Sequence, residues 1–177
     1  MTVNKKRLGL SKNMYVGISK TATAFRPKNE DVFCILDADD WLSKDALETV
    51  AAVYKKHPET LVTYGSYIKE SIGRKTKISR PYPKLATVRR YPWRASHLKT
   101  MRWKVLKNIS KTWFVYKNEW LPAASDVALM LPILELAGLH RCRHISKAIY
   151  HWRDNTEFKT NRKLQKKCEK IIRHDLV

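Results

Sequence analysis

The chain has 177 residues, and its 36 basic and 16 acidic residues leave a formal net charge of +20 at pH 7. A hydrophobic content of 44%, with only five glycines and seven prolines, excludes a disordered or collagen-like chain and predicts one folded domain. Three widely spaced cysteines exclude a disulfide framework and a thiolate zinc site, and no apolar run is long enough for a membrane-spanning helix. We therefore expect a cytoplasmic protein that meets an anionic partner.

The first part of the chain predicts alternating helices and strands. Apolar side chains at helical spacing predict a helix over residues 11–25. The five apolar residues 32–36 predict a strand that is buried on both faces of a parallel sheet. A helix that Ser43 can cap follows and ends before Pro58. Residues 60–68, rich in β-branched and aromatic side chains, predict a second strand that pairs with the first in parallel.

The second part begins with prolines between residues 81 and 92, which predict a long surface loop. Residues 95–109 have apolar side chains on one helical face and basic ones elsewhere, so they predict a basic amphipathic helix. A further helix is expected from Asp126 to Gly138, followed by a short strand at 145–152. The charged residues 156–174 predict a helical tail.

Charge is segregated along the chain. Residues 71–118 contain 14 basic residues and no acidic one, whereas acidic residues gather between Glu30 and Glu48. Such a basic stretch is often only a solvated face, but it can also bind an anionic partner.

The acidic residues include Asp37, Asp39 and Asp40, which directly follow the first predicted strand. The carboxyl ends of parallel strands are where open α/β sheets bind ligands. Carboxylates this close repel one another and need a cation, and their hard oxygen atoms suit Mg²⁺ or Mn²⁺ held together with substrate phosphates. The alternative is an acidic turn whose last carboxylate only caps the next helix.

Residues 31–42 contain an apolar strand followed directly by Asp-x-Asp-Asp. This pattern resembles the Asp-x-Asp region of family 2 glycosyltransferases with the GT-A fold. The helix near residue 13 and the strand around Tyr64 are similar to the elements that flank that region. Residues 95–102 and 125–138 resemble the acceptor side of a subgroup of these enzymes, and residues 149–155 resemble its closing strand and loop.

The resemblance implies a role for each matching position. Asp39 would bind the divalent metal, Mn²⁺ or Mg²⁺, and Asp37 would support the metal or contact the donor ribose. Asp126 would be the general base of an inverting enzyme, although a carboxylate at a helix start can also be a simple N-cap. The remaining donor-binding or substrate-binding candidates, each with a structural role as the alternative, are Asp40, His97, Arg102, His151 and Arg153.

The resemblance also implies an α/β fold with a mostly parallel, GT-A-like sheet between helices, from which the N-terminal part of the nucleotide-binding half is missing. We expect residues 1–155 to form this partial domain and residues 156–177 to form a basic tail. A sheet without its first strands has an unpaired edge, which predicts self-association or a partner chain that completes it.

Three functions follow as hypotheses. The favoured one is metal-dependent transfer of a sugar from a nucleotide-sugar donor, such as a UDP-sugar, to a glycan or lipid-linked acceptor. The alternatives are a nucleic-acid-binding protein, suggested by aromatic residues within the basic stretch, and a remnant of the fold that acts as an interaction module. Under the favoured hypothesis, the basic stretch, with Lys99, Arg102 and Lys104, would face an anionic acceptor or a membrane surface, where the protein would lie peripherally.

Overall fold

The computed structural model describes residues 4–70, 75–83, 87–153 and 161–176. Its strands are β1 (Val32–Ile35), β2 (Trp41–Leu42), β3 (Val62–Glu70), β4 (Lys75–Lys77), β5 (Lys99–Arg102), β6 (Val115–Tyr116), β7 (Glu119–Trp120) and β8 (Cys142–Arg153). Its α-helices are α1 (Leu10–Phe25), α2 (Ala46–Lys56), α3 (Trp103–Leu106), α4 (Ser125–Ala137) and α5 (Arg162–His174). Two short 3-10 helices are η1 (Lys111–Phe114) and η2 (Leu139–Arg141).

Six strands form one mixed sheet, in which β1, β5, β3, β8 and β2 lie side by side in that order and β4 pairs with β3. The pairing of β3 with β8 is parallel, whereas β5 is antiparallel to both β1 and β3 and β2 is antiparallel to β8. Strands β1, β3 and β8 therefore run in the same direction. The prediction that the strands at 32–36 and 60–68 pair directly was wrong, because β5 lies between them.

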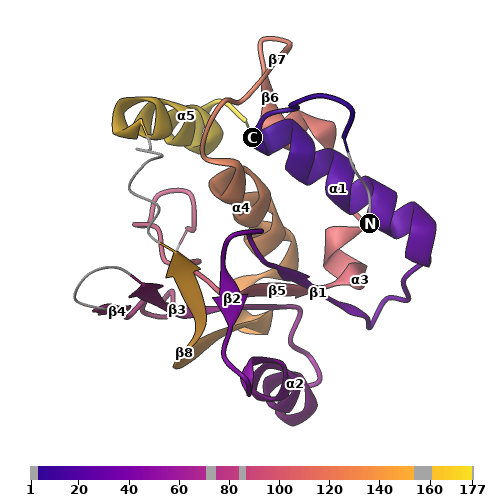
Figure 1. Cartoon of the computed structure of the whole chain (residues 1–177), viewed down its shortest axis with the longest axis vertical. Helices are drawn as coiled ribbons and strands as arrows, with labels where there is room; N and C mark the ends of the chain where they lie inside the picture. The colour runs from indigo at the N-terminus through magenta and orange to yellow at the C-terminus, as the bar shows by residue number, and fades with distance from the viewer. Residues whose placement is uncertain (1–3, 71–74, 84–86, 154–160, 177) are drawn as a thin grey trace.

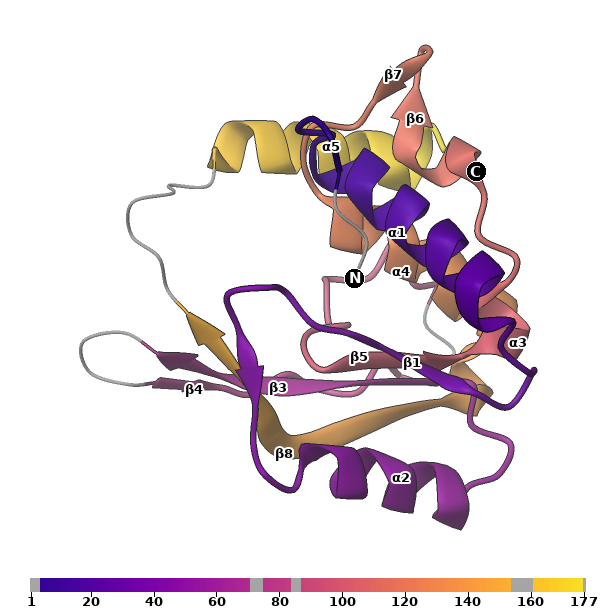
Figure 2. The ribbon, with the colours of Figure 1, turned by 45° about the vertical axis from the view of Figure 1, so that its right-hand side comes forward.

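Helices cover both faces of the sheet (Figure 1). Figure 2 shows α2 on one face and α1, α4 and α5 on the other. Each face has its own hydrophobic core. Val50 and Tyr54 of α2 pack with Ile149 in one core, while α4 lies at the centre of the other and is buried along most of its length. The predicted α/β class, with a sheet between helices, is confirmed.

Two local predictions are confirmed and two were wrong. Helix α1 agrees with the predicted helix at 11–25, and α4 ends before Gly138 as expected. The predicted helix at 95–109 is instead strand β5 followed by the single turn α3, because β5 forms hydrogen-bonded ladders with strands on both sides. Ser43 does not cap α2, which begins after Asp45 without a side-chain cap.

Strand β1 lies at the edge of the sheet. Val32 is 41% exposed and Leu36, directly after the strand, is 45% exposed, so the prediction of a strand buried on both faces was wrong. The apolar run correctly indicated a strand, but it could not reveal that among the described strands only β5 pairs with it. Among the described strands, β1 pairs on one side only, so it has the unpaired edge that the sequence predicts. Within the described residues, no helix has the length and apolar character that crossing a membrane requires.

Helix α5 packs against α4 and belongs to the same core. Cys168 and Ile172 are its buried residues. The side-chain oxygen of Gln165 accepts a hydrogen bond of 3.2 Å from the backbone N–H of Ala124, directly before α4. The guanidinium of Arg173 donates to backbone carbonyls of the loop that contains Val88. Helix α5 is thus attached to the start of α4 through Gln165 and to the loop at Val88 through Arg173.

Candidate active site

The acidic turn, residues 37–40, connects β1 to β2 and is held by the end of β8. The carboxylate of Asp40 accepts hydrogen bonds from the hydroxyl of Tyr150, at 2.5 Å, and from the backbone N–H of Arg153, at 2.8 Å. The backbone N–H of Asp37 is 3.4 Å from the same Tyr150 hydroxyl, which accepts from it. Burial raises the pKa of Tyr150, and its hydrogen bond to Asp40 adds to this effect. Tyr150 therefore joins the two ends of the turn.

The other two carboxylates of the turn differ in their surroundings. Asp39 is exposed and has no hydrogen bond or ion pair within the described part of the chain, so it is free to bind a ligand. Partial burial raises the pKa of Asp37, as do the nearby charges of Asp40, Asp39 and Asp126, while Lys99 opposes the rise. The turn therefore contains one free carboxylate, Asp39, and a second one, Asp37, whose ionised form a bound cation would stabilise.

Asp126 lies in the first turn of α4. The residue that precedes this helix is Ala124, in the left-handed conformation, and no side chain caps the helix. The alternative that Asp126 is an N-cap is therefore wrong. Its negative charge is favoured by the positive end of the helix dipole. Its side chain is 36% exposed, and its Oδ2 atom is 3.9 Å from Nζ of Lys99.

Sequence reasoning did not identify Lys99 as a residue of the site, because the helical pattern of residues 95–109 places Lys99 on the solvated side of a helix. As part of β5 it shares a sheet face with Met101, which packs in the core beneath α4. Its side chain is only 3% exposed. Burial lowers the pKa of Lys99, whereas the charges of Asp126, Asp37 and Asp40 oppose the lowering. Lys99 and Met101 are two residues apart, and in a strand such residues point to the same face of the sheet. This spacing is the signal that could have indicated a lysine directed toward the core.

His97 lies next to Lys99. Its ring stacks on Tyr150 with centroids 4.3 Å apart, and its Nδ1 atom is 3.4 Å from Nζ of Lys99. Burial and the Lys99 charge lower the pKa of His97 to about 3, so the imidazole is neutral at pH 7. The loop that carries it approaches β3 at Gly65, where an added Cβ atom would lie 2.8 Å from the carbonyl oxygen of Ile145 and 3.3 Å from that of His97. His97 thus fits the site as a packed neutral group.

The structure corrects the location of Arg102, which lies at the far end of β5, roughly 10 Å along the strand from Lys99. Its guanidinium pairs with Glu30 and donates to the carbonyl of Thr60 at 2.9 Å. It also lies over the ring of Tyr54. Arg102 therefore joins structural elements and is not part of the cluster around the acidic turn.

His151 and Arg153 lie on β8 beside the turn. His151 contacts Glu70 through Nδ1, at 2.8 Å, and Ser43 through Nε2, at 2.9 Å, and its ring stacks on Trp41. Both ring nitrogens therefore have protein partners, which indicates a structural role. Arg153 is exposed, and its guanidinium lies 5.7 Å from the centre of the Trp41 ring. Its backbone holds Asp40, while its side chain can reach an anionic ligand.

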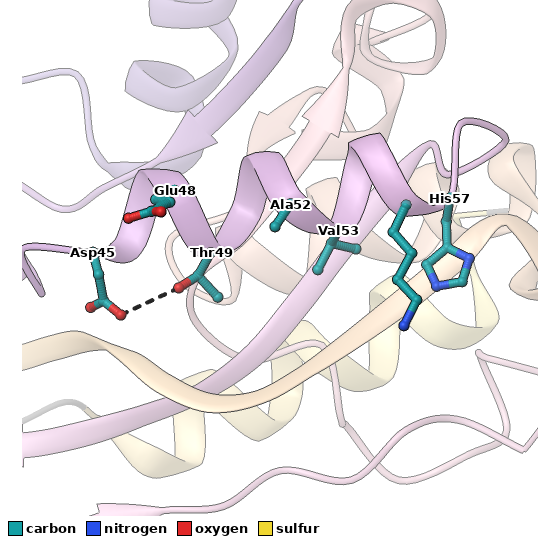
Figure 3. Close-up of a pocket in the computed structure, with 7 residues that line it drawn as sticks. Asp45, Glu48, Thr49, Ala52, Val53 and His57 are labelled. Carbon is teal, nitrogen blue, oxygen red and sulfur yellow. Dashed lines mark hydrogen bonds between the residues drawn. The ribbon is translucent and has the colours of Figure 1, made fainter.

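A shallow groove along one side of α2 is a separate feature (Figure 3). Its lining comes from one helix and its ends, namely Asp45, Glu48, Thr49, Ala52, Val53, Lys56 and His57. None of these residues belongs to the cluster of the acidic turn, Lys99 and Asp126, which we call the acidic site.

Residues 1–121 match the family model described as Glycosyl transferase family 2. The chain belongs to this family. No curated protein matches the chain. Family membership supports the GT-A-like interpretation of the fold and a general glycosyltransferase activity. The matched part contains the acidic turn, His97 and Lys99, whereas Asp126 and the end of β8 lie beyond it.

The donor atoms of the acidic site fit a divalent cation that is held together with a substrate. The described residues contain no group of three or more His, Cys, Asp or Glu side chains arranged to hold a metal ion on their own. However, Asp37, Asp39, Asp40 and Asp126 carry more negative charge than Lys99 compensates. Mg²⁺ and Mn²⁺ are commonly bound by one or two carboxylates and completed by phosphate oxygens and water.

Proposed function

We propose that this family member transfers a glycosyl group from a nucleotide-sugar donor, with UDP-sugars as the first candidates, to a hydroxyl group of a glycan or lipid-linked acceptor. The observation that carries the proposal is that Asp126 and two residues of the acidic turn, Asp37 and Asp40, act on one buried ammonium. The Oδ2 atom of Asp126 is 3.9 Å from Nζ of this lysine, Lys99. Strands and a helix that are far apart in sequence thereby present carboxylates to the same space.

In the proposed reaction, Asp126 accepts the proton of the acceptor hydroxyl as the hydroxyl oxygen attacks the anomeric carbon. The new carbon–oxygen bond forms while the bond from the anomeric carbon to the donor phosphate breaks, and the nucleoside diphosphate leaves. Attack from the side opposite the leaving group inverts the anomeric centre. A partly exposed carboxylate suits this role, because it can reach an acceptor and still accept a proton.

Asp39, with support from Asp37, would hold the Mg²⁺ or Mn²⁺ ion. When bound, this ion would neutralise charge on the donor diphosphate. Asp40 would not bind it directly, since Tyr150 and the backbone of Arg153 already occupy its carboxylate. The guanidinium of Arg153 could add a contact to a phosphate from the rim of the site.

Thermal unfolding tests the proposed function. We expect UDP-sugars with Mn²⁺ to raise the unfolding temperature, and UDP-sugars with EDTA to raise it much less, because a ligand that binds the folded state stabilises it. A chromatographic assay of sugar release and transfer then identifies the donor. Salt-sensitive stabilisation by single-stranded DNA, with no response to any nucleotide sugar, would instead favour the nucleic-acid hypothesis.

The structure removes two residues from the basic surface that the sequence suggested for the anionic partner. Lys99 is buried and Arg102 is paired with Glu30, so neither can meet a membrane, whereas Lys104 is exposed. Arg74 and Lys84 lie outside the described residues. Helix α5 offers a better surface, because four exposed lysines recur along one side of it. This α5 lysine face consists of Lys163, Lys166, Lys167 and Lys170.

We propose that the α5 lysine face binds an anionic lipid surface and keeps the protein peripherally at a cytoplasmic membrane. No described acidic side chain forms an ion pair with these four lysines. The apolar side of α5 is packed in the core, so the attraction is electrostatic and involves no insertion. Gln165 connects this helix to the start of α4, which would bring a lipid-linked acceptor near Asp126.

Replacing all four lysines of the face by glutamine should weaken binding to vesicles of phosphatidylcholine with a fifth of phosphatidylserine more than tenfold, since each lysine contributes about 1 kcal/mol near such a surface. The matched control replaces Lys20, Lys28, Lys55 and Lys56 by glutamine. These lysines are also exposed, and their replacement lowers the net charge by the same amount. Co-sedimentation at several salt concentrations measures both. Equal losses in the two variants would mean that only the overall charge matters and would contradict the proposal.

A further inference from the structure

Lys99 is the least exposed charged group of the acidic site. Lysines are seldom fully buried unless they are paired, because removing an ammonium from water is costly. Its strand, β5, pairs with β1 at Lys99 itself, opposite Ile35, and with β3 at the next two residues, so the backbone that carries this side chain is part of the sheet. Its Nζ atom is 3.9 Å from Asp126 and 3.4 Å from Nδ1 of His97, which can only accept a hydrogen bond from an ammonium.

The charges of Asp126, Asp37 and Asp40 all act on this ammonium, and their carboxylates are held in different ways. Asp40 has two hydrogen-bond donors, the Tyr150 hydroxyl and the Arg153 backbone N–H. For Asp126, the ion pair with Lys99 is the one side-chain interaction found within the described residues. Without Lys99, the Asp126 side chain would be free to turn toward solvent, and it would face the negative acidic turn without an intervening cation.

We propose that Lys99 is the positioning residue of the acidic site: its buried ammonium pairs with one oxygen of Asp126 and keeps this carboxylate directed at the acceptor position. This inference rests on the proposed function. The ammonium touches neither the acceptor nor the anomeric carbon and acts through Asp126. A rigid strand is a suitable support, since a displacement of about 1 Å at a reacting group can cost roughly a hundredfold in rate.

The test compares Lys99→Met, which is uncharged and similar in shape, with Lys99→Arg, which retains the charge. We expect Lys99→Met to lower kcat about tenfold to a hundredfold while the KM for the donor changes less than about threefold. Lys99→Arg should recover a large part of kcat, because a cation is again present beside Asp126. Lys20→Met, which removes an exposed lysine of α1 outside the site, is the matched control and should leave both constants unchanged.

A double-mutant cycle distinguishes positioning from a general packing defect. If Lys99 acts through Asp126, Lys99→Met should cause little further loss of kcat in an Asp126→Asn background, whereas independent effects would multiply. Wild-type kcat in Lys99→Met, or multiplication of the two losses, would overturn the inference.

The same cycle measured by the midpoint of urea unfolding needs no activity. The ion pair predicts that the midpoint shift caused by Lys99→Met differs between the wild-type and Asp126→Asn backgrounds. A shift that is the same in both would overturn the inference even if the protein transfers no sugar. Absence of transfer in the wild type with non-additive midpoints would instead reject the proposed function alone.

Discussion

Asp126→Asn should lower kcat at least about a hundredfold, because general-base catalysis typically contributes 10² to 10⁴-fold and an amide cannot accept the acceptor proton. Asparagine keeps the shape of the side chain, so the donor should still bind and its KM should change little. The first turn of α4 would lose a favourable charge, which costs about 0.3–1 kcal/mol of stability, and the buried Lys99 would lose its nearest counter-charge, so the unfolding temperature should decrease. Steady-state kinetics together with thermal unfolding separate the two effects.

A carboxylate on the same helix serves as the control for this variant. Glu135 lies near the other end of α4 and forms an ion pair with Arg89 at 2.7 Å, outside the acidic site. Glu135→Gln should therefore keep wild-type kcat even where its stability falls. If Asp126→Asn retained kcat within about threefold of the wild type, which is far less than loss of a general base should cost, Asp126 would not be the base.

Asp39→Asn should abolish the part of donor stabilisation that depends on Mn²⁺. At a donor concentration of 100 times Kd, binding stabilises the folded wild type by about 2.7 kcal/mol, which corresponds to roughly 5–10 °C for a chain of this size. The variant loses a free carboxylate that has no protein partner among the described residues, so its stability without ligand should remain near that of the wild type. Thermal unfolding with the donor, with and without Mn²⁺, measures the difference.

Asp175→Asn provides the comparison, since Asp175 is also an exposed aspartate but lies after α5. It should retain the full effect of Mn²⁺. An unchanged metal-dependent shift in Asp39→Asn would remove Asp39 from the proposed metal site. An equal shift with and without Mn²⁺ in the wild type would indicate that donor binding does not require the ion.

Sequence reasoning located the acidic turn because its signal is local. An apolar strand followed at once by Asp37, Asp39 and Asp40 contains both the element and the chemistry within nine residues, 32–40. The helix that begins near Asp126 was also predictable from its apolar pattern. That Asp126 lies near the turn was implied by the resemblance to the family, because no local pattern states which distant elements meet.

Lys99 shows why the other residues of the site could not be predicted from the sequence. The spacing of apolar residues between 95 and 109 suits a helix, and a strand of four residues is too short to outweigh that pattern. What decides the conformation is the pairing with β1 and β3, which come from other parts of the chain. The same is true of His151, whose partners Ser43 and Glu70 are distant in sequence.

The position of β5 between β1 and β3 also affects how the sheet can assemble during synthesis. Lys99 follows Ile35 by 64 residues, so at about 5–20 residues per second β1 leaves the ribosome roughly 3–13 s before its neighbour exists. During that interval its apolar side chains and free backbone groups are open to incorrect pairing. During the same interval, the carboxylates that follow β1 have no Lys99 to offset their charge. Nascent chains with an incomplete sheet would therefore be the species that most needs a chaperone.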